Sequence, residues 1–142
     1  MITRFKPLRS RAGHPGTVLP AAPAPLIYVV DDHEAVVELY TIFLEANGYN
    51  VRSFTDRVAA LTALRTERAK PDLLITDYVG PSMPIEGFIR QCLAAHPELR
   101  ILMASGCHES DVDFVHPLPD RFIQKPFTAE ELRQEVEAAL AA

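Results

Sequence analysis

The sequence contains no tryptophan, only two cysteines and no apolar run that approaches the length of a membrane span. A transmembrane helix needs roughly 20 consecutive apolar residues, so a membrane span is excluded. Cys92 and Cys107 are too few for a disulfide framework and lack zinc-site spacing, so we expect two buried or half-buried free thiols. The 142 residues, 48% hydrophobic and 23% charged, suffice for one domain of ordinary size.

Negative charge is absent from the first 25 residues, which hold four Lys or Arg residues and five of the twelve prolines. Closely spaced prolines favour extended, solvated backbone, so we expect 1–25 to form a flexible basic tail. The prolines also interrupt the apolar stretch that an export signal needs, and we expect a cytoplasmic protein. Residues 26–142 carry 10 Lys and Arg against 19 Asp and Glu, a net charge of −9. Such an acidic body does not suit a phosphate backbone, which predicts that this domain does not bind nucleic acid.

Five short apolar runs alternate with helical patterns from residue 26 onward. The runs predict strands over 26–30, 51–54, 72–76, 100–104 and 121–124. The helical patterns predict helices over 32–47, 56–68, about 86–95 and from 128 onward, with a short or irregular fourth helix within 107–120. This alternation predicts an α/β fold, a five-stranded parallel sheet with helices on both faces in a doubly wound, flavodoxin-like (βα)5 architecture.

The spacing of apolar residues predicts which helix faces are buried. The residues expected to face inward are Val36, Leu39, Tyr40, Phe43 and Leu44 in the first helix, Val58, Leu61 and Leu64 in the second, and Leu132, Val136 and Leu140 in the last. Gly48 stands where a glycine ends a helix, and Thr128-Ala129-Glu130-Glu131 is a capping box that opens the last helix.

Polar side chains suited to chemistry follow four of the five predicted strands. They are Asp31 and Asp32, then Asp77, then Ser105, then Lys125. Parallel strands joined by right-handed crossovers have their carboxyl ends at one edge of the sheet, so we expect these side chains to meet there. Three crowded carboxylates repel one another unless a cation neutralises them, and hard oxygen ligands suit Mg²⁺. Asp77 is suited to accept a phosphoryl group covalently, with Lys125 neutralising its oxygens and Ser105 donating a hydrogen bond.

Four segments around these residues carry a resemblance to a known family. They are Val29-Val30-Asp31-Asp32, Ile75-Thr76-Asp77, Ile101-Leu102-Met103-Ala104-Ser105-Gly106 and Phe122-Ile123-Gln124-Lys125-Pro126-Phe127. Over residues 26–141 the chain resembles the receiver domain of two-component response regulators, the CheY-like superfamily of phosphorelay signalling. The resemblance implies that Asp77 accepts a phosphoryl group from a histidine kinase or a histidine phosphotransfer protein. No Gly-rich phosphate loop occurs, so a bound nucleotide is not indicated.

The resemblance also implies a metal site and a switch. The implied Mg²⁺ ligands are Asp32 directly, Asp31 mostly through water, Asp77, and the backbone carbonyl of Val79. Lys125 would pair with the phosphate, and the Lys125–Pro126 peptide bond would be cis. Ser105 would move toward the phosphate, and the ring of Phe122 would fill the vacated space. For Phe122, plain core packing is an alternative.

Two segments depart from the family's pattern. The loop at 78–86 is about two residues longer than usual, and Pro81 and Pro84 compete for the family's proline position, which leaves the register open. The 107–120 segment is short and bears prolines, which puts the family's usual dimerisation or partner surface in doubt.

The chain ends just after the last predicted helix, so we expect a stand-alone receiver that signals through protein–protein contacts. It would have no separate substrate turnover and is therefore not expected to be an enzyme. A metal-dependent phosphohydrolase shares the carboxylates and the lysine, but it normally has Asp-x-Asp after its first strand, where this chain has adjacent acids. A pseudo-receiver, a binding module that is never phosphorylated, is the second alternative. His33 adjoins the acidic pair, and we expect it at the surface.

Overall fold

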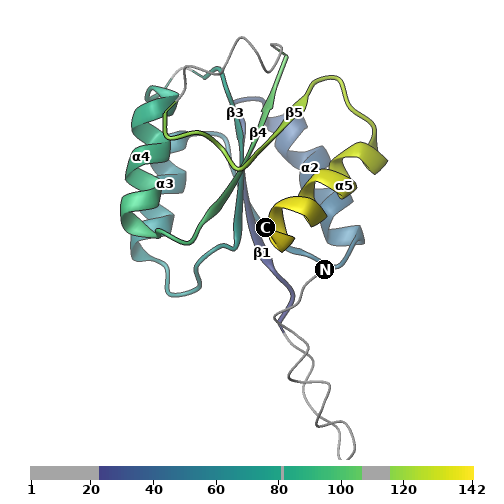
Figure 1. Cartoon of the computed structure of the whole chain (residues 1–142), viewed down its shortest axis with the longest axis horizontal. Helices are drawn as coiled ribbons and strands as arrows, with labels where there is room; N and C mark the ends of the chain where they lie inside the picture. Colours follow the sequence, from purple (N-terminus) through teal and green to yellow (C-terminus); the bar gives the residue numbers. More distant parts are fainter. Residues whose placement is uncertain (1–22, 81, 107–115) are drawn as a thin grey trace, which may run out of the picture.

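The computed structural model describes residues 23–80, 82–106 and 116–142 (Figure 1). Five parallel strands form one sheet in the order β2-β1-β3-β4-β5. The strands are β1 (Leu26–Val30), β2 (Asn50–Phe54), β3 (Leu73–Asp77), β4 (Arg100–Ser105) and β5 (Arg121–Gln124). Each predicted strand is confirmed to within one residue at either end.

Helices cover both faces of the sheet (Figure 1). They are α2 (Glu34–Ala46), α3 (Arg57–Thr66), α4 (Ile85–Ala95) and α5 (Ala129–Ala141). The first and last of these pack on one face, and α3 and α4 pack on the other. The predicted doubly wound α/β fold is therefore confirmed. The helix expected within 107–120 falls mostly at 107–115, outside the described residues, and 116–120 are not helical.

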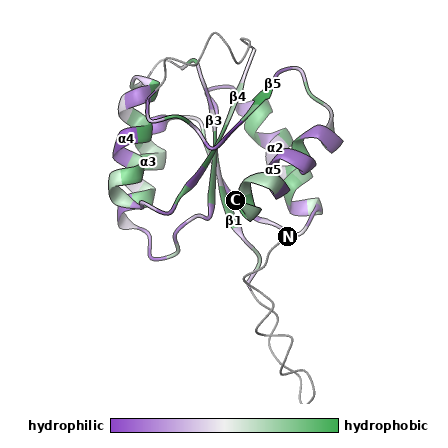
Figure 2. Cartoon of the chain, viewed as in Figure 1, coloured by the Kyte–Doolittle hydropathy of each residue, from purple (hydrophilic) through white to green (hydrophobic). Residues whose placement is uncertain are grey.

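The buried strands send alternate side chains to the two faces. In β1, Ile27 and Val29 contact the α2–α5 side, whereas Tyr28 and Val30 contact the α3–α4 side. Because both faces are covered, the strand reads as a continuous apolar run rather than an alternating one. Figure 2 shows that the helices carry hydrophobic and hydrophilic residues together, as expected for elements with one face on a sheet.

Two of the residues expected to face inward are exposed instead. Leu39 in α2 is 68% exposed and Val58 in α3 is 51% exposed, so those two predictions are wrong. In α2 the stripe on the sheet is Val37, Tyr40 and Leu44. Successive residues of a helix lie about 100° apart, so Leu39, next to Tyr40, points well away from the sheet.

The predicted helix ends are confirmed. Gly48 has a φ of 91°, the left-handed conformation that favours glycine, and it follows Asn47, the C-cap of α2. At the start of α5, the Thr128 side chain accepts from the backbone N–H of Glu131, whose carboxylate in turn accepts from the backbone N–H of Thr128. Among the described residues, no helix has the length and apolar character needed to cross a membrane.

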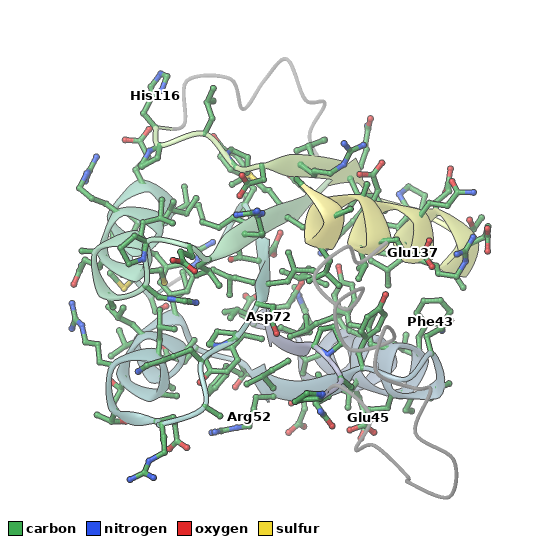
Figure 3. The ribbon with its side chains drawn as sticks, turned by 60° about the horizontal axis from the view of Figure 1, so that its bottom comes forward. Phe43, Glu45, Arg52, Asp72, His116 and Glu137 are labelled. Carbon is green, nitrogen blue, oxygen red and sulfur yellow. The ribbon has the colours of Figure 1, made fainter. Side chains whose placement is uncertain are left out.

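At the amino edge of the sheet, Asp72 (labelled in Figure 3) holds three strands in register. Its carboxylate accepts from the backbone N–H of Leu26 at 3.0 Å, and its carbonyl accepts from the backbone N–H of Arg100 at 3.3 Å. Cys92 in α4 is a buried free thiol as expected, whereas Cys107 lies outside the described residues. Burial raises the pKa of the Cys92 thiol to about 12, so it stays protonated.

Candidate functional site

The carboxyl edge of the sheet brings the predicted polar residues together. Asp31 and Asp32 follow β1, Asp77 ends β3, Ser105 ends β4 and Lys125 follows β5. The strand register places Asp77 beside Ala104 and Ser105 beside Gln124, one residue before the lysine. The backbone N–H of Lys125 extends this ladder by donating to the Ser105 carbonyl at 2.7 Å.

The ammonium group of Lys125 lies between two of the carboxylates. Its Nζ is 2.9 Å from Oδ2 of Asp31 and 3.7 Å from Oδ1 of Asp77. The Lys125–Pro126 peptide bond is cis, as the resemblance implies. The lysine just after the last strand therefore links the acid that follows the first strand to the acid that ends the third strand, and these acids are far apart in the sequence.

Asp31 is the most buried of the three acids, with a side chain only 1% exposed. Burial raises the pKa of its carboxyl group. Hydrogen bonds from the backbone N–H of His33 and from Lys125 outweigh that effect, so the pKa lies below its ordinary value. Asp31 is thus held ionised in a place where a lone carboxylate would be costly.

Asp77 is shifted in the opposite direction. Burial raises its pKa most, Lys125 lowers it, and the neighbouring charge of Asp31 raises it again, with a net increase over the ordinary value. Hydrogen bonds from the backbone N–H groups of Tyr78 and Val79 lower it by less. Two adjacent carboxylates whose pKa values are pushed apart are typical of a functional site.

The three carboxylates line one small cavity of about 10 Å³, roughly the room that a single water molecule needs. Its lining is Val30, Asp31, Asp32, Thr55, Arg57, Asp77, Val79, Gly80 and Ser82. Carboxylate and carbonyl oxygens around a space of this size are the donor set that Mg²⁺ takes when it keeps some of its water. The residues present therefore fit a magnesium ion.

His33 lies at the rim of this acidic group. Its Nδ1 is 3.1 Å from Oδ1 of Asp31 and 3.2 Å from Oδ1 of Asp32. The three side chains together could hold a metal ion. The imidazole is 71% exposed, which confirms the predicted surface position.

Ser105 and Phe122, the two residues of the implied switch, differ in burial. Ser105 is 1% exposed at the end of β4. Phe122 in β5 is half-buried and packs against the core cluster under α3 and α4. The ring therefore has core contacts, and its role as a switch stays a prediction.

In the loop after β3, the sequence left open which proline, Pro81 or Pro84, takes the family's proline position. Pro84 immediately precedes α4 and caps it, so the helix begins at Ile85 and Gly87 lies inside it. Pro81 lies outside the described residues. The structure thus places the Met83-Pro84 pair at the helix start.

The cavity also has lining residues that were not expected from the sequence, namely Thr55, Arg57, Gly80 and Ser82, and Arg57 is the charged one among them. Arg57, the first residue of α3, is 4% exposed and lines the cavity with the three acids. The signal was present, because Arg57 comes three residues after β2, whose carboxyl end lies at the same edge of the sheet.

Comparison with known proteins agrees with the fold and with the position of the acidic site. Residues 27–137 match the family described as the response regulator receiver domain. The chain belongs to this family. Receiver domains take phosphoryl groups from histidine kinases and generally bind Mg²⁺ at an acidic pocket.

Solved structures of receiver domains share the fold. A CheY-like receiver domain protein from Methanospirillum hungatei superimposes with a TM-score of 0.75, at 22% identity, covering 83% of this chain and 94% of that one. A response regulator receiver protein from Sinorhizobium medicae gives a TM-score of 0.74, at 24% identity, covering 84% and 96%.

Curated relatives are longer proteins. The DNA-binding response regulator MtrA of Mycobacterium tuberculosis is 36% identical over 118 residues, which is 80% of this chain and 50% of MtrA. The alkaline phosphatase synthesis regulatory protein PhoP of Bacillus subtilis is 34% identical over 117 residues, 80% of this chain and 48% of PhoP. The chain therefore spans about half the length of these relatives.

Proposed function

We propose that the chain is a phosphoacceptor domain in which Asp77 takes a phosphoryl group from a histidine kinase or a histidine phosphotransfer protein. The observation that carries this is the position of the Lys125 ammonium, 2.9 Å from Asp31 and 3.7 Å from Asp77. A cation fixed there can balance the negative charge that an incoming phosphoryl group adds beside the acceptor. Asp32 lines the same cavity as both of those acids.

The transfer needs few protein groups. An Oδ atom of Asp77 attacks phosphorus while the bond from phosphorus to the donor imidazole nitrogen breaks, and the departing histidine keeps the electron pair. Lys125 would stabilise the equatorial oxygens, and the hydroxyl of Ser105 would donate to one of them. When bound to Asp31, Asp32, Asp77 and the Val79 carbonyl, Mg²⁺ would neutralise charge on the transferring group.

The proposed output is a change in protein–protein contacts, transmitted by Ser105 and Phe122. The domain would not turn over a separate substrate, and in this sense it is a signalling domain rather than an enzyme. The net charge of −9 on residues 26–142 disfavours contact between this domain and nucleic acid. DNA binding is named for the MtrA relatives, so the absence of nucleic-acid binding stays a prediction. The stand-alone state and the cytoplasmic location stay predictions as well.

The proposal is tested by incubating the chain with acetyl phosphate and Mg²⁺ and measuring its intact mass. We expect one phosphate to be added to the wild type and none to Asp77→Asn, because the amide is a poor nucleophile. Continuous release of inorganic phosphate at a rate far above the decay of the adduct would instead indicate a phosphohydrolase. If neither an adduct nor released phosphate were found, the chain would be a pseudo-receiver. Both this outcome and continuous phosphate release would reject the phosphoacceptor role.

A further inference from the structure

Arg57 is a buried cation whose charge is not matched by its hydrogen-bond partners. Its Nη1 donates to the carbonyl of Met83 and its Nη2 donates to the carbonyl of Asp77, both at 2.7 Å. Both acceptors are main-chain oxygens, which satisfy the donors but carry no net charge. A buried guanidinium is stable only where other groups compensate its charge.

The site carboxylates provide that compensation. Arg57 lines the same cavity as Asp31, Asp32 and Asp77. Burial lowers the pKa of Arg57, and the negative charges of these three acids offset part of that lowering. A guanidinium stays protonated under all such influences, so Arg57 is a permanent positive charge at the acidic site.

The loop between β3 and α4 keeps this charge in place. The backbone N–H of Arg57 donates to Oγ of Ser82 at 3.3 Å, and a Cβ added to Gly80 would lie 3.2 Å from the Arg57 Cζ. The loop main chain therefore lies directly against the guanidinium, which also sits 5.9 Å from the centre of the Phe88 ring. Contacts with Gly80, Ser82 and Met83 therefore fix the position of Arg57.

We propose that Arg57 is a fixed second cation of the acidic site and that its charge lowers the affinity of the site for Mg²⁺. This inference rests on the proposed function, because it concerns the metal that phosphorylation of Asp77 would use. The three carboxylates carry three negative charges, and Lys125 and Arg57 neutralise two of them, which leaves a net charge of −1. Removing Arg57 would double the net negative charge that a divalent ion meets, and we expect affinity to rise about tenfold.

The test measures Mg²⁺ binding directly, by isothermal titration calorimetry of the unphosphorylated full chain. Arg57→Gln keeps amide donors but removes the charge, whereas Arg57→Lys keeps the charge. Arg65→Gln is the matched control, because it removes one positive charge from the exposed far end of the same helix. There Arg65 donates a hydrogen bond to the side-chain oxygen of Gln91. We expect Arg57→Gln to bind Mg²⁺ about tenfold more tightly than the wild type and the other two variants to stay within about threefold of it.

Unchanged or weaker Mg²⁺ binding by Arg57→Gln would overturn the inference. If Arg57→Gln and Arg57→Lys both bound Mg²⁺ more weakly than the wild type and to the same extent, the role of Arg57 would be to hold the loop and not to supply charge. If Arg57→Gln is unfolded without metal, we expect added Mg²⁺ to restore a cooperative thermal transition. A variant that stays unfolded at saturating Mg²⁺ would also overturn the inference, because Mg²⁺ could not then replace the lost charge.

Failure of the proposed function would look different. A wild type that binds Mg²⁺ but takes no phosphate from acetyl phosphate would reject the phosphoacceptor role, and the effect of Arg57 on Mg²⁺ affinity would still be measured. A wild type that binds no Mg²⁺ would overturn both.

Discussion

Replacing Lys125 with methionine is expected to slow phosphorylation of Asp77 by acetyl phosphate by about 10² to 10³-fold. The ammonium is the group that links Asp31 to Asp77, and methionine keeps its length without its charge. The phosphoryl group would then develop negative charge beside three carboxylates with one fewer cation to balance it. Initial rates of adduct formation, followed by intact mass at saturating Mg²⁺, measure the effect.

The control for that variant is Lys70→Met. Lys70 donates to the carbonyl of Leu64, at the end of α3 that is remote from the carboxyl edge. The same chemical change there is expected to alter the rate by less than about twofold. A Lys125→Met protein that folds, binds Mg²⁺ and is phosphorylated at nearly the wild-type rate would remove Lys125 from the proposed chemistry.

Replacing Leu102 with alanine is expected to lower the free energy of unfolding by about 2–5 kcal/mol. Leu102 is fully buried in β4, where its side chain packs in the cluster between the sheet and the α2–α5 layer. Truncation removes buried methyl groups and leaves a cavity that the surrounding strands can close only in part. Equilibrium unfolding in urea, monitored by circular dichroism, gives the difference.

Leu39→Ala is the matched control, since it is the same substitution on an exposed face of α2. With 68% of its surface exposed, Leu39 loses little buried area on truncation, and we expect a change within about 0.5 kcal/mol. If both variants lost similar stability, the packing of α2 described above would be wrong.

Leu39 and Leu102 also differ in whether their burial could be predicted from the sequence. The strands could be predicted because fully buried parallel strands are short apolar runs, and Gly48 and Thr128 mark helix ends through their backbone chemistry. Apolar residues of α2 such as Leu39 and Ile42 also lie on its exposed side, so spacing alone did not distinguish Leu39 from Tyr40. That distinction depends on how the helix is rotated against the sheet, which is a tertiary property.

The site residues also differ in whether they could be predicted from the sequence. Asp31, Asp32, Asp77, Ser105 and Lys125 could be placed at one edge because the carboxyl ends of parallel strands meet there. Arg57 could not be predicted in the same way, because it lies three residues beyond the end of β2 and because an arginine at the start of a helix is usually solvent-exposed. Its contact with the Met83 carbonyl depends on the path of the β3–α4 loop, whose register the sequence left open.

We expect folding to make Asp77 the single acceptor of a phosphoryl group. Borohydride reduces an acyl phosphate to the alcohol and leaves free carboxylates unchanged, so a phosphorylated aspartate becomes homoserine. After treatment with acetyl phosphate and Mg²⁺ and then borohydride, peptide sequencing by tandem mass spectrometry is expected to find homoserine at position 77 alone. Homoserine at position 31 or 32, or at no position in a folded protein that binds Mg²⁺, would show that Asp77 is not the phosphoacceptor.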